Sequence, residues 1–113
     1  MSEYQKFVTG YCAEYAIALH ERFGYPLYVI KGVFPGGDYE IAHAFVSADG
    51  GATGLDASGA SGVESIKAAC FFSRRPRQVK VSRVSRESLE WEVGVEDEAL
   101  VEARQLVAER GRP

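Results

Sequence analysis

Two tight-turn signals divide the first half of the chain into short strand-like segments, and they constrain the fold more than any other feature. The first is Pro35-Gly36-Gly37-Asp38 and the second is Ala48-Asp49-Gly50-Gly51. They separate segments at 26–34, 39–47 and 52–57, which are rich in β-branched, aromatic or alternating apolar residues. Segments joined by such short turns pair as antiparallel neighbours. The sequence therefore predicts a mainly antiparallel sheet.

Helical patterns flank these segments. Residues 11–23 carry apolar side chains at helical spacing, and the pattern stops at Gly24. After the third strand-like segment, Ser61 or Gly62 is placed to begin a helix that runs to about Cys70. The sequence thus predicts one helix before the strands and a second after them.

The last third of the chain adds one strand and two helices. Apolar and polar residues alternate over 78–84, which predicts a half-exposed strand. Ser85 is placed to cap a short helical segment, and 97–110 reads as a final helix. The order of elements predicts an α+β fold, with the N-terminal helix packed on a small, mainly antiparallel sheet and with C-terminal helices.

The bulk composition narrows the class of protein. With 113 residues, 46% of them hydrophobic and 26% charged, the chain fits a single globular domain over 1–113 and not a disordered protein. Its apolar runs are far shorter than the ~20 residues of a membrane span, and the start lacks the pattern of a signal peptide. Two cysteines make no disulfide framework. We expect a cytoplasmic protein without a membrane partner.

Charge is segregated along the chain. The net charge is −3, yet residues 74–86 contain no acid and carry six basic side chains. These are Arg74, Arg75, Arg77, Lys80, Arg83 and Arg86. Such a run is either a solvated strand that pairs with acidic neighbours or a surface for a protein partner. Nucleic acid is not expected as a partner, because the chain is acidic overall and aromatic residues are not interleaved with the arginines.

Cys12 stands at the start of the predicted first helix, directly after a Gly10-Tyr11 step. The first turn of a helix has unpaired N–H groups and a positive dipole end, so a thiolate is stabilised there. A nucleophilic cysteine needs this stabilisation, together with N–H donors for the developing oxyanion. The alternative is a small buried residue that fills a gap between helix and sheet.

His43 and Asp56 lie in the second and third strand-like segments, on either side of the second turn. If Asp49 and Gly50 form the centre of that turn, His43 stands directly opposite Asp56, with Cβ atoms roughly 4.5–5.5 Å apart. If Gly50 and Gly51 form the centre, the two are diagonal neighbours, still within reach. A slip by one residue would put them on opposite faces. Alternatively, His43 bonds to backbone and Asp56 only ends its strand in an Asx turn.

These residues resemble a known pattern. Gly10-x-Cys12-x-Glu14-x-Ala16, the Gly24-Tyr25-Pro26 step into a strand, His43-Ala44-Phe45-Val46 and the later Leu55-Asp56 resemble a transglutaminase-like core. That family belongs to the papain-like cysteine superfamily, and the resemblance covers about residues 9–59. It implies Cys12 as the nucleophile, His43 as general base and acid, and Asp56 as the residue that orients the imidazole.

The chain also departs from the family pattern. A Trp often precedes the family's Asp, whereas Gly54 and Leu55 stand there in this sequence. Papain-like enzymes place a Gln before the nucleophile as an oxyanion donor. Gln5, seven residues before Cys12, and Tyr11 are the accessory candidates here. The backbone N–H of Cys12 is expected to supply part of the oxyanion site.

We therefore expect a thiol-dependent enzyme that acts on a protein or peptide amide as a peptidase, deamidase or acyl transferase, without a cofactor. A further alternative is a metal site formed by Cys12, His43 and Asp56. The alternative from another class is a catalytically silent papain-like scaffold, such as a phage or mobile-element accessory protein. It would bind or inhibit a protein partner through the basic 74–86 segment.

Overall fold

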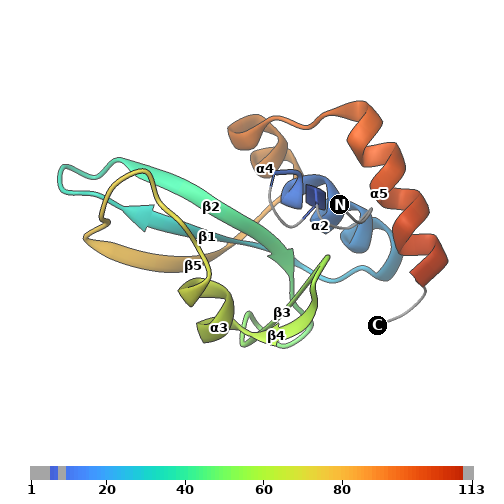
Figure 1. Ribbon diagram of the computed structural model, residues 1–113, viewed down its shortest axis with the longest axis horizontal. Coiled ribbons are helices and arrows are strands. Elements are labelled where there is room, and N and C mark those ends of the chain that lie inside the picture. Colours follow the sequence, from blue (N-terminus) through green and yellow to red (C-terminus); the bar gives the residue numbers. More distant parts are fainter. Residues whose placement is uncertain (1–5, 8–9, 111–113) are drawn as a thin grey trace.

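Five antiparallel strands form one sheet in the order β4-β3-β2-β1-β5 (Figure 1). The computed structural model describes residues 6–7 and 10–110. Its elements are α2 (Cys12–Phe23), β1 (Leu27–Val33), β2 (Tyr39–Val46), β3 (Thr53–Asp56), β4 (Gly59–Gly62), α3 (Val63–Ala68), β5 (Gln78–Val84), α4 (Arg86–Val93) and α5 (Asp97–Arg110). The predicted α+β fold, with an N-terminal helix, an antiparallel sheet and C-terminal helices, is confirmed.

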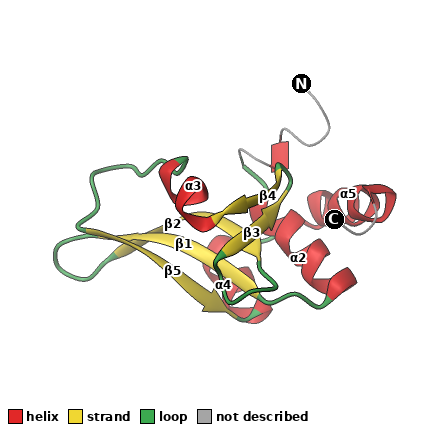
Figure 2. Ribbon diagram, turned by 90° about the horizontal axis from the view of Figure 1, so that it is seen from below, coloured by secondary structure: helices red, strands yellow, loops and turns green. Residues whose placement is uncertain are grey.

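Both faces of the central strand β1 are buried. Leu27 and Val29 lie in a core formed with α2, α4 and α5, whereas Tyr28 and Ile30 face α3 across the other side of the sheet. Figure 2 shows α3 and α4 on opposite sides of the strands. A strand covered on both faces needs a continuous apolar run, and residues 27–30 provide one. The β1–β2 hairpin and β5 extend beyond the helices (Figure 1).

The turn between β2 and β3 decides how His43 and Asp56 meet. Val46 pairs with Leu55, which is the register expected for a turn centred on Gly50 and Gly51. Both glycines have positive φ angles, of 74° and 97°, whereas Asp49 does not. A type I′ turn needs positive φ at both central residues, so the register with Asp49-Gly50 at the centre was wrong. The Asp49 carboxylate instead accepts hydrogen bonds within the turn.

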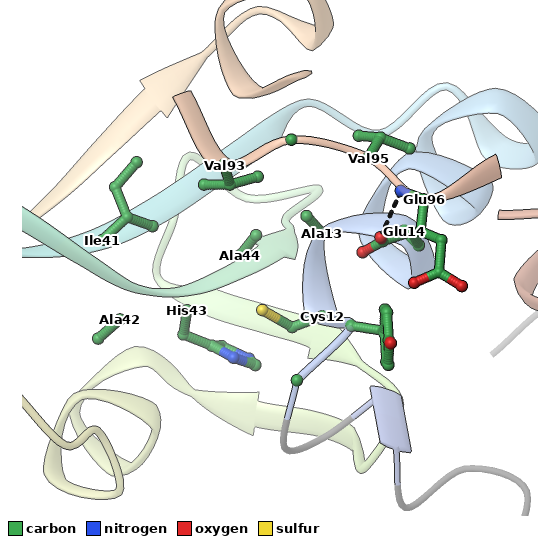
Figure 3. Close-up of a pocket in the computed structure, with 13 residues that line it drawn as sticks. Cys12, Ala13, Glu14, Ile41, Ala42, His43, Ala44, Val93, Val95 and Glu96 are labelled. Atoms are coloured by element: carbon green, nitrogen blue, oxygen red, sulfur yellow. Dashed lines mark hydrogen bonds between the residues drawn. The ribbon is translucent and has the colours of Figure 1, made fainter. Parts of the chain in front are cut away.

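A β-bulge interrupts the pairing of β2 with β1 and changes the predicted faces of β2. The register shifts by one residue at Ala42. Figure 3 shows Ala42 and His43 on one side of β2, with Ile41 and Ala44 on the other. Strict alternation along 39–46 would put Ile41 on the same face as His43, and the bulge breaks that alternation. A bulge redirects side chains in this way, and here it lies beside the candidate site.

Two further differences concern the segment after β3. Residues 59–62 form the edge strand β4, which was not predicted, and it pairs with all four residues of β3. Helix α3 begins only at Val63 and ends at Ala68, so Cys70 lies beyond it. At the C-terminal end the predictions hold, since the Ser85 side chain accepts a hydrogen bond from the Ser88 N–H at the start of α4.

Candidate active site

Cys12 begins helix α2 and lines a cleft of about 480 Å³ with β2 and the loop between α4 and α5. Figure 3 shows its sulfur directed toward the imidazole of His43. The preceding residue, Tyr11, does not cap the helix with its side chain, and the first turn from Cys12 to Glu14 borders the cleft. The half-buried thiol and the N-terminal N–H groups of the helix thus border the same cleft.

His43 and Asp56 are directly bonded. His43 Nε2 lies 2.7 Å from Asp56 Oδ2, and the two side chains are only 12% and 15% exposed. The second carboxylate oxygen, Oδ1, accepts the Ser58 N–H at 2.9 Å. Asp56 therefore makes the Asx-type turn and also holds the imidazole, so the two interpretations of this residue coexist. The diagonal register keeps the pair within reach, as expected for the second turn geometry.

The surroundings favour the charged form of His43. Burial lowers the pKa of its imidazole, but hydrogen bonds to Asp56 and to Cys12, with the charges of both groups, outweigh burial and raise that pKa from 6.5 to about 9. Because Nε2 of His43 bonds to Asp56, Nδ1 is the ring nitrogen that is available to the Cys12 thiol. At neutral pH the site is thus arranged to hold an imidazolium between a sulfur and a carboxylate.

Glu14 lies in the same helical turn as Cys12 but is directed elsewhere. Glu14 is 4% exposed, and its carboxylate accepts the N–H of Glu96, on the α4–α5 loop, at 3.0 Å (Figure 3). This bond ties helix α2 to the loop whose Val95 lines the cleft, next to Val93 at the end of α4. This contact was not predicted, because no local pattern links two residues 82 positions apart.

The two accessory candidates have different outcomes. Gln5 lies outside the described residues. The backbone N–H of Tyr11 donates to the Lys6 carbonyl at 3.0 Å, so it is not directed at the cleft. A hydrogen bond between the Tyr11 hydroxyl and Glu96 raises the pKa of Tyr11. Among the described residues that border the thiol, the first-turn N–H groups of α2 are the donors that can face a developing oxyanion.

The remaining cysteine and histidine, Cys70 and His20, lie as follows. The Cys70 thiol donates to the Ile66 carbonyl at 3.3 Å, and burial followed by the negative charges of Cys12 and Asp56 raises its pKa. His20 Nδ1 lies 2.7 Å from the Tyr25 carbonyl oxygen, away from the cleft. Within residues 6–7 and 10–110, no group of three or more His, Cys, Asp or Glu side chains is arranged to hold a metal ion.

The basic 74–86 segment is paired only at its ends. Arg74 forms an ion pair with Asp38, and Arg86 pairs with Glu21 and Glu90. The other four basic side chains of this segment, Arg75, Arg77, Lys80 and Arg83, form no ion pair with the described residues. Strand β5, which carries two of them, is an edge of the sheet.

Comparison with protein-family models, with curated proteins and with solved structures finds no match to this chain. The resemblance to transglutaminase-like proteins therefore stays a prediction that rests on the motifs quoted above. Among the described helices none is both long enough and apolar enough to cross a membrane.

Proposed function

We propose that this chain is a thiol-dependent enzyme that acts on protein or peptide amides by hydrolysis, deamidation or acyl transfer. The observation that carries the proposal is the hydrogen-bonded His43–Asp56 pair beside the thiol of Cys12, at the N-terminal end of α2. A cysteine, a histidine and a carboxylate in this order form one set of groups that carries out covalent acyl transfer. A cytoplasmic setting would suit it, because the thiol must stay reduced.

In the proposed reaction the Cys12 thiolate attacks the carbonyl carbon of the amide, and the carbonyl electrons move to oxygen. The first-turn N–H groups of α2 stabilise that oxyanion. His43 then donates its proton to the amide nitrogen, the C–N bond breaks, and an acyl thioester remains on Cys12. Water or an acceptor amine attacks the thioester while His43 accepts a proton, which regenerates the thiolate–imidazolium pair.

Asp56 acts through His43 in this scheme. Its bond to Nε2 fixes the ring so that Nδ1 is directed at the thiol, and its charge stabilises the imidazolium. Asp56 is thus a positioning residue, whereas Cys12 and His43 contact the reacting atoms.

Acylation by p-nitrophenyl acetate tests the proposal without a known substrate. We expect release of p-nitrophenolate with the acetyl group found on Cys12 by peptide mass spectrometry, and a rate at least about 100-fold lower in His43→Ala. His20→Ala is the matched control and should leave the rate unchanged, because His20 lies away from the cleft. Acetylation that is equal at both cysteines, or that is indifferent to His43, would contradict the proposal.

A second candidate function is binding of an acidic protein partner through the basic 74–86 segment. It is favoured by the four basic side chains that lack ion pairs, along and before the edge strand β5. Charge reversal at Arg75 and Arg77 should then weaken capture of a partner, and the affinity should fall with salt. Binding that is unaffected by Cys12→Ala but lost on charge reversal would favour this function over the enzyme.

A further inference from the structure

A second cleft, of about 490 Å³, lies beside His43. It shares Ala42 and His43 with the first cleft, and it includes Asp56 but not Cys12. Its apolar lining comes from α3 and the residues that follow it. These are Ile66, Ala69, Cys70 and Phe71. His43 therefore stands between two clefts, only one of which is lined by Cys12.

Phe71 is the most exposed large apolar residue among those described, with 92% of its surface accessible. A single exposed apolar residue is ordinary on a protein surface, but this one borders the cleft beside His43. Burial of a phenylalanine ring by a ligand removes a large apolar area from water. Phe71 is thus available for contact with an apolar group that enters the cleft.

The neighbours of Phe71 hold its loop in place. The Phe72 ring packs so closely over Gly32 that a Cβ at Gly32 would lie 2.7 Å from it. Ser73 donates from both its N–H and its hydroxyl to the Glu40 carboxylate. The backbone on the C-terminal side of Phe71 is therefore anchored to β1 and β2, so the exposed ring is presented from a fixed position. Preorganisation of this kind lowers the cost of binding.

The chemistry of the first cleft assigns a role to the second. The acyl carbon must lie beside Cys12 and the first-turn N–H groups, which border the first cleft only. The amine that leaves must receive its proton from His43, which borders both clefts. We propose that the second cleft binds the amine side of the substrate. On this proposal the residue after the scissile amide bears an aromatic or large apolar side chain that contacts Phe71.

This inference rests on the proposed function and names the substrate class more closely. The one cationic group of the second cleft is the imidazolium of His43, which is already bonded to Asp56, and the Asp56 carboxylate also accepts the Ser58 N–H. An acidic side chain therefore meets no unpaired cation there, whereas an uncharged ring meets Phe71 and Ile66. The ligand class is an amine with an aromatic side chain, such as the amino group of a phenylalanine residue.

Aminolysis of the acetyl-enzyme tests this directly, because an acceptor amine occupies the place of a leaving amine. Cys12 is acetylated with p-nitrophenyl acetate, and phenylalanine amide and glycine amide then compete for the thioester. The amine nitrogen forms a bond to the acyl carbon, the C–S bond breaks, and the amine proton passes to His43. We expect phenylalanine amide to be preferred, and this preference to fall about fivefold in Phe71→Ala. Trp91→Ala is the matched control, since Trp91 is 89% exposed but lines neither cleft.

Each outcome bears on the inference. The measured quantity is the ratio of the two acetylated amides, so it does not depend on how much enzyme is acetylated. An unchanged preference in Phe71→Ala, or an equal loss in Trp91→Ala, would overturn the inference while leaving the proposed function intact. Failure of Cys12 to be acetylated at all would overturn both. Phe71→Leu, which keeps an apolar side chain, should show an intermediate ratio.

Discussion

The bond between His43 and Asp56 has a measurable consequence, because it supports a pKa of about 9 on the imidazole. Asp56→Asn keeps a hydrogen-bond acceptor of nearly the same shape but removes the charge. A neighbouring opposite charge shifts a pKa by about one to three units, so we expect the pKa of His43 to fall by that much. Burial lowers the pKa of this ring, and the loss of the carboxylate leaves Cys12 alone to oppose it.

The chain has only two histidines, so the imidazole protons can be followed by NMR across a pH titration. His43→Ala assigns the resonance. Asp49→Asn is the matched control, because Asp49 is a carboxylate of the same hairpin whose bonds stay within the turn. A wild-type pKa near 6.5, or the same pKa in Asp56→Asn as in the wild type, would refute the reasoning.

Protonation of His43 also affects the free energy of unfolding. The pKa of His43 is higher in the folded state, so its contribution is fully present below pH 6.5 and is lost as the pH rises through about 9. A rise from 6.5 to about 9 corresponds to about 3 kcal/mol at 1.36 kcal/mol for each pKa unit. The free energy of unfolding, measured with urea, should therefore fall more steeply over this range in the wild type than in His43→Gln. Parallel pH profiles would contradict this expectation.

Two further predictions concern packing around the site. Gly54→Ala should lower the free energy of unfolding by about 1–3 kcal/mol, because a Cβ there would lie 2.4 Å from Ile66 Cδ1 and 2.7 Å from the Phe45 ring. An unchanged free energy of unfolding in urea would show that the packing around Gly54 has room for a methyl group. Glu14→Ala should expose the amide of Glu96 to hydrogen exchange, whereas Glu14→Gln, which can still accept its N–H, should protect it nearly as well. Equal protection in both variants would mean that this bond does not hold the loop.

The fold class was predictable because local signals were strong and agreed with one another. Residues 27–30 are apolar without interruption, as a strand buried on both faces requires, and 78–84 alternates as a half-exposed edge strand does. The Ser85 cap and the helix from Asp97 also carry their own signals. Each of these elements is set by residues close to one another in sequence.

The errors arose where backbone geometry outweighed side-chain preference. Strand β4 has the sequence Gly-Ala-Ser-Gly, which has no β-propensity, and it exists because β3 offers a free edge for pairing. The bulge at Ala42 leaves no mark in the alternation of residues 39–46. The turn at Gly50-Gly51 was one of two registers that the sequence allowed, and the strand pairing and the backbone angles of the fold distinguish them.

The candidate site was partly predictable for the same reason. One hairpin brings His43 and Asp56 together, so a local argument found the pair. Cys12 meets His43 only because α2 packs on the sheet, and the spacing of residues along the chain does not predict that packing. The resemblance of the motifs suggested this contact instead. The Glu14–Glu96 bond and the exposed ring of Phe71 had no signal in the sequence.

The measurement that tests the central claim most directly is the rate of alkylation of each cysteine by iodoacetamide at pH 7, in the wild type and in His43→Ala. If His43 activates the thiol, Cys12 reacts several times faster than Cys70 in the wild type. That difference disappears in the variant. Burial raises the pKa of Cys70, so this cysteine reacts slowly and serves as the internal reference. Equal rates at the two cysteines, or a fast Cys12 that does not respond to the loss of His43, would contradict the account.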